Sequence, residues 1–303
     1  MKPRAVVVGE ALVDVVGDDA YVGGSPLNVA VGLSRLGVAA CLHARVGDDD
    51  HGALIASHLD EAGVERCPTF VDSGRTSTAA ATVEADGSAS YEFDLDWRID
   101  EPDVSEATLV HTGSIAAVLE PGGSVARAAI RAAGPATLRS FDPNIRADIM
   151  GDAGRARRLI CDLAAVCHVV KLSDEDAAWL GVETGQTAEE VLRSISDSGA
   201  RLAVMTRGRN GCMAIVDGAA VERPAYPVEL VDTIGAGDAF MSGLLFGIVR
   251  DGIDRHLVEG RSLGPEEIVR VLDTALASAA IAVSRSGAQP PSPDELDGLL
   301  GRG

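Results

Sequence analysis

The chain has 303 residues, of which 46% are hydrophobic, and this is enough to bury a large core in one α/β domain or in two smaller ones. Its 46 acidic and 26 basic residues give a formal net charge of −20, and the absence of a lysine or arginine run argues against a nucleic-acid-binding protein. Any anion must therefore bind in a local pocket made of backbone N–H groups and a few cations.

The cysteine pattern and the N-terminus bear on where the protein works. The five cysteines include no C-x-x-C pair and their number is odd, so we expect neither a disulfide framework nor a zinc site, and we expect a reducing cytoplasm. Residues 1–4 lead into an apolar strand without the apolar core of a signal peptide, and no apolar run reaches membrane-spanning length. We therefore expect neither a membrane nor a nucleic acid as a partner.

The N-terminal part of the chain predicts two strands and then two helices. The apolar run at residues 5–8 is typical of a buried strand. Ser25 resembles an N-cap, Pro26 suits the first helical position, and Gly37 is a typical helix stop. We expect strands over residues 5–8 and 11–16, and helices over residues 26–36 and 51–62.

Residues 69–97 break this pattern, because strand-like segments follow one another there without a helix between them. Residues 77–84 and 90–96 are joined by the sequence Ala-Asp-Gly-Ser at residues 85–88, which is a hairpin signal. We expect a small antiparallel layer inserted into an otherwise alternating chain.

Strand–helix alternation then resumes and continues to the C-terminus. The sequence Thr-Ala-Glu-Glu at residues 187–190 is a capping box, which predicts a helix that ends near Gly199. Repeated strand-then-helix units predict a mostly parallel central sheet with helices on both faces. We expect strands over residues 109–112, 137–141, 166–172, 202–206 and 212–216, and helices over residues 123–133, 152–165, 266–284 and 293–300 and from residue 236.

The most informative segment is residues 232–240, with the sequence DTIGAGDAF. Gly235, Ala236 and Gly237 open a strongly helical segment, and a helix N-terminus carries roughly half a positive charge that attracts an anion. Asp238 follows in the first turn, where a carboxylate beside a bound phosphate can take the proton from an attacking hydroxyl. The alternative interpretation is a glycine-rich turn before a core helix.

A second glycine-rich element lies near the N-terminus. Gly23 and Gly24 would let the backbone approach a ligand closely, and Asn28, one helical turn later, could hold two hydroxyls. The alternative is a tight turn followed by a solvent-facing Asn. In open α/β sheets ligands bind outside the carboxyl ends of the strands, so we expect a polar rim there. Polar residues that follow predicted strands are Asp14 and residues 142–146, 173–176 and 206–208.

These motifs resemble those of the PfkB, or ribokinase-like, carbohydrate kinases, and the resemblance covers essentially the whole chain. It implies an α/β, ribokinase-like fold in a single kinase domain over residues 1–303, with a small β-lid formed by about residues 10–24 and 69–98. The matching motifs, in order, are Gly23-Gly24 with Asn28, Gly47-x-Asp49-x-x-Gly52, and Asp232-Thr233-x-Gly235-Ala236-Gly237-Asp238.

The resemblance also implies a role for each matching position. Asp238 would be the catalytic base, and Gly235, Ala236 and Gly237 would form an anion hole. Contacts to the sugar are implied for Asp14, Gly24, Asn28, Phe93 and Arg146, and contacts to the nucleotide for Lys171, Ser173, Thr206, Gly208 and Gly211. A monovalent cation, K⁺ by expectation, would be held near Asp232, Ile234, Ala282, Arg285 and Gly287.

The chain departs from the family pattern at residues 173–176. The family often has Asn-x-x-Glu where this chain has Ser-Asp-Glu-Asp. Asp176 could still organise the water shell of Mg²⁺, which keeps several waters in most sites. A helix N-cap with acids in its first turn explains these residues equally well. The acidic run at residues 48–50 is interpreted as a solvated helix start.

The implied activity is transfer of the γ-phosphoryl group of ATP to a primary hydroxyl of a small sugar, with fructose or a related ketose favoured. The sequence Asp142-Pro143-Asn144-x-Arg146 is similar to that of fructokinases and 2-keto-3-deoxygluconate kinases, but residues 91–98 lack the Phe-Tyr-Arg expected of a fructokinase. Ribose, 2-keto-3-deoxygluconate and nucleoside kinases remain alternatives, as does a sugar- or nucleotide-binding regulator without activity. A dehydrogenase is disfavoured because G-x-G-x-x-G is missing. Exposed lid edges favour a homodimer.

Overall fold

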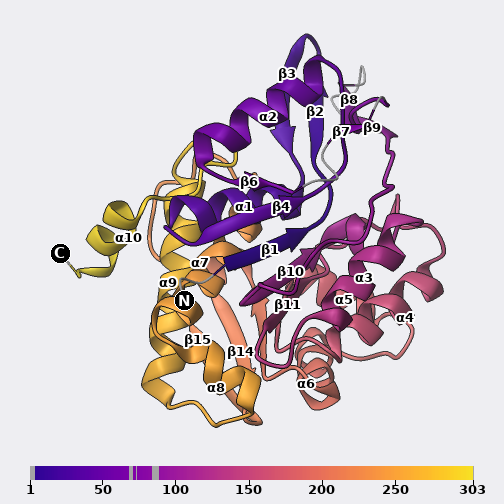
Figure 1. Cartoon of the computed structure of the whole chain (residues 1–303). Coiled ribbons are helices and arrows are strands. Elements are labelled where there is room, and N and C mark those ends of the chain that lie inside the picture. The colour runs from indigo at the N-terminus through magenta and orange to yellow at the C-terminus, as the bar shows by residue number, and fades with distance from the viewer. Residues whose placement is uncertain (1–3, 68–70, 73, 84–88, 303) are drawn as a thin grey trace.

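The computed structural model describes residues 4–67, 71–72, 74–83 and 89–302. Within these residues nine strands form one central sheet, which is parallel from β6 to β13 and antiparallel at β14 and β15 (Figure 1). The order is β15 (Ala219–Arg223), β14 (Cys212–Val216), β13 (Leu202–Thr206), β12 (Val169–Ser173), β11 (Leu138–Asp142), β10 (Leu109–Gly113), β1 (Arg4–Val8), β4 (Ala39–His43) and β6 (Glu65–Arg66).

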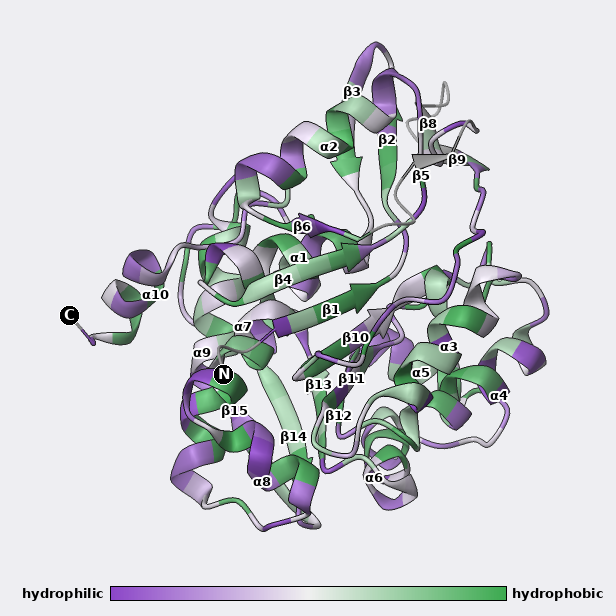
Figure 2. Ribbon diagram, in the orientation of Figure 1, coloured by the Kyte–Doolittle hydropathy of each residue, from purple (hydrophilic) through white to green (hydrophobic). Residues whose placement is uncertain are grey.

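Helices cover both faces of the central sheet, and each face has its own apolar cluster. Along β1, Ala5 and Val7 join one cluster while Val6 and Val8 join the other, as the alternation of side chains in a strand requires. Figure 2 shows the strands β4 and β14 as largely hydrophobic. The first face carries α1 (Ser25–Arg35), α2 (Asp50–Ala62), α7 (Ala236–Arg250), α8 (Ile253–Glu259) and α9 (Pro265–Val283), and the second carries α3 (Gly122–Ala132), α4 (Ala153–Ala164), α5 (Asp174–Gly181) and α6 (Ala188–Ser198).

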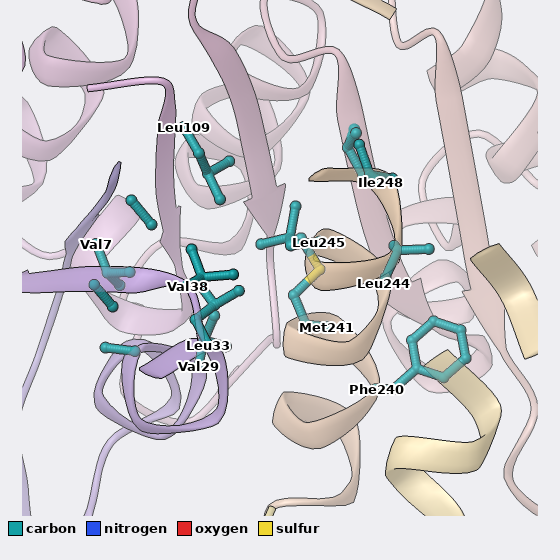
Figure 3. Packing of buried hydrophobic residues seen from close by; sticks show 14 of the residues in the cluster. Val7, Val29, Leu33, Val38, Leu109, Phe240, Met241, Leu244, Leu245 and Ile248 are labelled. Carbon is teal, nitrogen blue, oxygen red and sulfur yellow. The ribbon is translucent and has the colours of Figure 1, made fainter. Parts of the chain in front are cut away.

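Helix α7 is the centre of the first face and is buried on nearly all sides. Figure 3 shows Leu245 of α7 pointing toward Leu109 of the sheet, beside Met241. Glycines let the neighbouring helices approach closely: a Cβ on Gly243 of α7 would lie 2.6 Å from Cβ of Ser278 in α9, and a Cβ on Gly32 of α1 would lie 2.3 Å from Oγ of Ser242. The short α10 (Pro293–Leu300) packs through Leu296 against Leu36 and Ala277.

A second, four-stranded sheet rises beyond the carboxyl end of β1 (Figure 1). Among the described residues its order is β3 (Asp19–Gly23), β2 (Leu12–Val16), β8 (Thr78–Val83) and β9 (Ala89–Asp94). Strands β2 and β8 are parallel and the other pairs are antiparallel. A short parallel pair, β5 (Val46–Gly47) and β7 (Val71–Asp72), lies in the connection. The predicted inserted hairpin is present as β8 and β9, and its turn, residues 84–88, lies outside the described residues.

The structure differs from the sequence-based expectations in several elements. The strands β4 and β15 were not predicted, because Ala-Ala-Cys-Leu-His and Ala-Ala-Val-Glu-Arg are poor in β-branched residues. Ser25 is the first residue of α1 and Gly24 is its N-cap, so Ser25 is not the cap. The expectation of no disulfide is wrong, because β4 and β6 pair and bring Cys41 and Cys67 together as a disulfide with a Cα–Cα distance of 6.2 Å.

The predicted capping box at residues 187–190 is confirmed, since the side chains of Thr187 and Glu190 bond to each other's backbone N–H at the start of α6. No helix in the described part of the chain is both long and apolar enough to cross a lipid bilayer.

We predict that Leu245→Ala lowers the free energy of unfolding by about 2–5 kcal/mol, because this fully buried side chain leaves a cavity between α7 and the sheet. Urea denaturation followed by circular dichroism measures the change. Leu299→Ala is the matched control, because Leu299 of α10 is 38% exposed and should cost about 1 kcal/mol or less. Equal losses in the two variants would contradict the packing described for α7.

Candidate active site

Polar side chains gather where the carboxyl ends of the central strands meet the start of α7. The segments that contribute them follow β1, β10, β11 and β12, and the second sheet stands beside them (Figure 1). This is the edge of an open α/β sheet at which ligands generally bind.

Asp238 lies in the first turn of α7 with only 7% of its surface exposed. Ser25 Oγ donates a hydrogen bond to its Oδ1 (2.6 Å), and Asn28 Nδ2 donates one to its Oδ2 (2.8 Å). Burial raises the pKa of Asp238, while the bonds from Ser25 and Asn28 oppose the rise. Two residues predicted from separate motifs, more than two hundred positions apart, are therefore in direct contact.

The three small residues before Asp238 form the N-terminus of α7. Gly235 takes the left-handed conformation at φ 71°, and a Cβ there would lie 2.7 Å from Cβ of Ala288. Ala236 and Gly237 are the first residues of the helix, and the first four N–H groups of a helix have no partner within it. The N–H of Ala236 donates to the carbonyl of Thr233 (3.2 Å), so the N–H groups of Gly237 and Asp238 are the candidates for binding an anion here.

Lys171 is buried directly beside this helix start. It is 3% exposed, its Nζ lies 2.9 Å from Oδ2 of the fully buried Asp142, and a Cβ on Gly237 would come within 3.0 Å of the same Nζ. Burial lowers the pKa of Lys171, but the carboxylates of Asp142, Asp176 and Asp238 together hold it above its ordinary value. Lys171 is therefore a fixed positive charge next to the predicted anion hole.

Gly24, Asp14 and Arg146 are further residues predicted to bind the sugar. Gly24 has φ 111°, and a Cβ there would lie 2.6 Å from the carbonyl oxygen of Glu10, so only glycine fits. Burial raises the pKa of Asp14 on β2, and the positive charge of Arg146 opposes the rise. Because Arg146 also lowers the pKa of Asp238, this exposed guanidinium lies within electrostatic reach of both carboxylates.

Phe93 lies farther out, in the second sheet. Cross-strand pairing puts it opposite Ala79, which is itself opposite Asp14. Residues directly opposite each other in a sheet point to the same face, so Phe93 and Asp14 share one face of the second sheet. Tyr21 pairs with Asp14 on the other side and belongs to the same row. Tyr21 was not predicted as a site residue.

The residues predicted to bind the nucleotide or Mg²⁺ lie at two places, the start of α5 and the turn after β13. Ser173 and Asp176 form a capping box at the start of α5, and the two oxygens of Asp176 accept bonds from the N–H groups of Ile145 (2.8 Å) and Ser173 (2.9 Å). The alternative interpretation of residues 173–176, a helix N-cap with acids in the first turn, thus accounts for the contacts of Asp176. Thr206 ends β13 opposite Ser173, and it opens the turn that contains Gly208 (φ 51°) and Gly211 (φ 83°).

The residues predicted for a monovalent cation also come together. The carboxylate of Asp232 accepts the N–H groups of Ile234 (3.0 Å) and Gly287 (2.8 Å), and these bonds hold its pKa below the usual range. The carbonyl of Ala282 accepts the N–H of Arg285 (3.2 Å) at the end of α9. Within the residues that the structure describes, no group of three or more His, Cys, Asp or Glu side chains could hold a metal ion.

Glu10 is a site residue that the sequence analysis missed. It directly follows Gly9 at the end of β1, is 5% exposed, and its Oε2 accepts the N–H of Ala116 (3.2 Å). Burial raises its pKa to about 7, against hydrogen bonds that include one from Ser114. A polar residue at the end of the first strand was the available signal.

A buried carboxylate beside a helix N-terminus is an arrangement in which a base can take a proton from an alcohol while an adjacent phosphate is held by backbone N–H groups. The chain belongs to the pfkB family of carbohydrate kinases, whose model, described as pfkB family carbohydrate kinase, matches residues 3–295. It is therefore a phosphotransferase with a sugar hydroxyl as acceptor.

Known proteins resemble the chain over nearly its full length. It is 32% identical to the fructokinase of Klebsiella pneumoniae, over 98% of each chain. The fructokinase of Vibrio cholerae O395, solved with fructose, ADP and calcium ion, has a TM-score of 0.82 and 27% identity over 99% of each chain, and a double mutant was solved with fructose, ADP and potassium ion. Fructokinase from Xylella fastidiosa with bound ATP has a TM-score of 0.81 and 26% identity, again over 99% of each chain. The predicted ribokinase-like α/β fold is confirmed.

We predict that Glu10→Gln changes how stability depends on pH. Between the ordinary pKa of 4.5 and the folded-state value of about 7, the folded protein keeps a proton that the unfolded chain releases. The contribution of Glu10 to stability therefore falls as pH rises through this window, by up to about 1.4 kcal/mol per pH unit. Because the amide that replaces the Glu10 carboxyl does not ionise, the variant should gain stability relative to wild type as pH rises from about 4.5 to about 7.

Urea denaturation at several pH values measures this difference. Glu106→Gln, at an exposed position, should follow the wild-type curve. Parallel curves for wild type and Glu10→Gln would show that Glu10 ionises at an ordinary pH.

Proposed function

We propose that this chain is an ATP-dependent kinase that phosphorylates a primary hydroxyl of fructose or a closely related ketose. The observation that carries the proposal is the Asp238 carboxylate, buried at the start of α7 and bonded by Ser25 and Asn28. The fructokinase relative and the solved fructokinases with fructose, ADP and ATP support the choice of substrates.

In this proposal Asp238 takes the proton from the sugar hydroxyl as that oxygen attacks the terminal phosphorus. Its raised pKa makes it a better proton acceptor than an ordinary surface carboxylate. The N–H groups at the start of α7 stabilise the negative charge of the transferring group, and the buried Lys171 adds a positive charge beside them. Such fixed dipoles need no reorganisation during the reaction.

The sugar would lie between the second sheet and α1. Asp14, Gly24 and Asn28 come from these two elements, and Arg146 reaches the same region from the loop after β11. We infer that the second sheet acts as a lid, with Asp14 and Phe93 on the face toward the sugar. Closure of a lid excludes water, which otherwise competes with the sugar as acceptor.

The nucleotide would lie along the turn after β13, near Thr206, Gly208 and Gly211. Mg²⁺ would polarise the phosphate oxygens. Because no all-protein metal cluster exists among the described side chains, a Mg²⁺ held largely by phosphates and waters fits, with Asp176 reaching it through water. We place a monovalent cation at the Asp232 segment and the end of α9 because the predicted residues meet there, and the Vibrio structure with potassium ion supports the choice of K⁺.

We predict that wild-type protein releases ADP with fructose in a panel of sugars, and that Asp238→Asn lowers turnover by at least about a hundredfold because the proton acceptor is lost. A coupled ADP-release assay measures turnover, and calorimetry should show that the variant still binds the sugar. The panel includes ribose and 2-keto-3-deoxygluconate as rival substrates.

Asp254→Asn is the matched control, because Asp254 also lies in the first turn of a helix and shares any effect on the helix dipole. It should keep wild-type turnover. Near-normal turnover of Asp238→Asn would overturn the role assigned to Asp238. If none of the sugars in the panel led to ADP release by the wild-type protein, a binding regulator would be favoured.

We also propose a homodimer formed through the second sheet. In the described part of the chain β3 and β9 are its outer strands, and open strand edges tend to pair with another chain. Light scattering should give about twice the 31.2 kDa mass of one chain. A mass of one chain across the accessible concentrations would contradict the dimer.

A further inference from the structure

The Gly47-x-Asp49-x-x-Gly52 motif takes no part in the proposed chemistry, yet it holds the second sheet onto the body of the protein. Asp49 is the N-cap of α2 and accepts the N–H of Gly52 at 2.8 Å. The same carboxylate accepts the N–H (2.9 Å) and the hydroxyl (2.5 Å) of Thr76, 27 residues later. The interpretation of this acidic run as a solvated helix start is therefore wrong for Asp49.

The two glycines of the motif are required by this joint. A Cβ on Gly47 would lie 2.3 Å from the carbonyl oxygen of Gly74 and 2.5 Å from the nitrogen of Thr76, and a Cβ on Gly52 would lie 2.0 Å from the carbonyl oxygen of Gly47. The N–H of Gly47 also donates to Oγ1 of Thr76 (3.0 Å). All three residues of the motif thus serve the same contact.

Backbone pairing connects Thr76 to Asp14, a residue predicted to contact the sugar. Thr76 immediately precedes Ser77, whose carbonyl accepts the N–H of Val13 at 3.0 Å. From there β8 pairs with β2 in parallel, with Ala79 opposite Asp14. A shift of Thr76 would therefore displace the strand that fixes the position of the Asp14 carboxylate.

The segment that follows β9 is hydrogen-bonded to the segment that precedes β8. Ser77 Oγ accepts the N–H of Asp96 (3.1 Å) and donates to its carbonyl (3.3 Å). The carboxylate of Asp96 pairs with the buried Arg45 at 3.1 Å, and Arg45 Nη1 donates to the carbonyl of Arg75 (3.2 Å). Both ends of the hairpin therefore bond to the loop that follows β4.

Asp49 is ionised in this arrangement. Burial alone would raise its pKa, but the hydrogen bonds from Thr76 and Gly52 outweigh burial and hold the pKa below its usual range. A carboxylate can accept all three of these bonds, whereas an amide side chain would turn one of its donors toward them.

We propose that Asp49 is a positioning residue for the sugar kinase reaction: through Thr76 it fixes the register of β8 against β2, and so holds Asp14 in place for the sugar. This role rests on the proposed function, because it acts through the sugar-binding Asp14. Asp49 itself bonds to Gly52 and Thr76 and is not among the residues proposed to contact either substrate.

The test compares Asp49→Asn with Asp48→Asn, since Asp48 is exposed and adjacent in the same acidic run. Asp49→Asn should raise KM for the sugar by about tenfold or more, because the charge-assisted hydrogen bonds from Thr76 to the Asp49 carboxylate are weakened or lost. KM for ATP should change by less than about twofold. Asp48→Asn should match wild type. Thr76→Val should resemble Asp49→Asn, and Thr76→Ser, which keeps the hydroxyl, should restore the wild-type KM.

Hydrogen exchange gives a readout that does not depend on turnover. In Asp49→Asn the amides of residues 13–16 and 76–80 should exchange faster, while those of α7 keep their wild-type protection. Unchanged sugar KM and exchange, or an equal rise of KM for sugar and ATP with faster exchange throughout, would overturn the positioning role. Both outcomes are distinct from failure of the proposed function, which would show as a wild-type protein inactive on every sugar.

Discussion

The contact of Asp238 with Ser25 and Asn28 is the interaction on which the site depends. It joins the starts of α1 and α7, two helices that come from opposite ends of the chain and share the first face of the sheet. A buried carboxylate is costly unless its oxygens are hydrogen-bonded, and here each oxygen accepts one bond from α1. The same contact places the Asp238 carboxylate at the start of α7, where the N–H of Ala236 donates to the carbonyl of Thr233 (3.2 Å) and the N–H groups of Gly237 and Asp238 have no partner within the helix. One contact therefore holds the proposed base beside the proposed anion site.

The second constraint is the close approach of backbone segments at glycines. It occurs among the helices α1, α7 and α9 and again where the second sheet meets α2. Below the site, Gly32 and Gly243 have no side chain, so α1, α7 and α9 approach closely, with only the small side chains of Ser242 and Ser278 against the two glycines. Beside it, Gly47 and Gly52 let the base of the second sheet lie against the start of α2. A rigid base and a separately attached sheet suit a reaction in which water must be excluded and product later released.

Sequence reasoning found the parts of the site that carry local signals and missed those that depend on tertiary contact. The strands at residues 202–206 and 212–216 have the predicted bounds, because apolar, β-rich runs flank a glycine turn. Glycine-rich motifs also identified the start of α7 and Asn28. Nothing local shows that Cys41 lies beside Cys67, or that Asp49 bonds Thr76 as well as capping α2, because each needs the pairing of segments about 26 residues apart. Glu10 was overlooked although the strand-end rule applied to it.

Charge balance explains why the site relies on backbone groups for anions. Glu10, Asp14, Asp142 and Asp238 all lie at or near the carboxyl ends of the strands, in a chain of net charge −20. Lys171 forms an ion pair with Asp142, and Arg146 lies within electrostatic reach of Asp14 and Asp238, so each positive charge of the site has acidic neighbours. The N–H groups of Gly237 and Asp238 are backbone dipoles, so a neighbouring carboxylate cannot neutralise them as it neutralises a cation. In an acidic chain the start of α7 is therefore a place where the backbone itself can attract an anion.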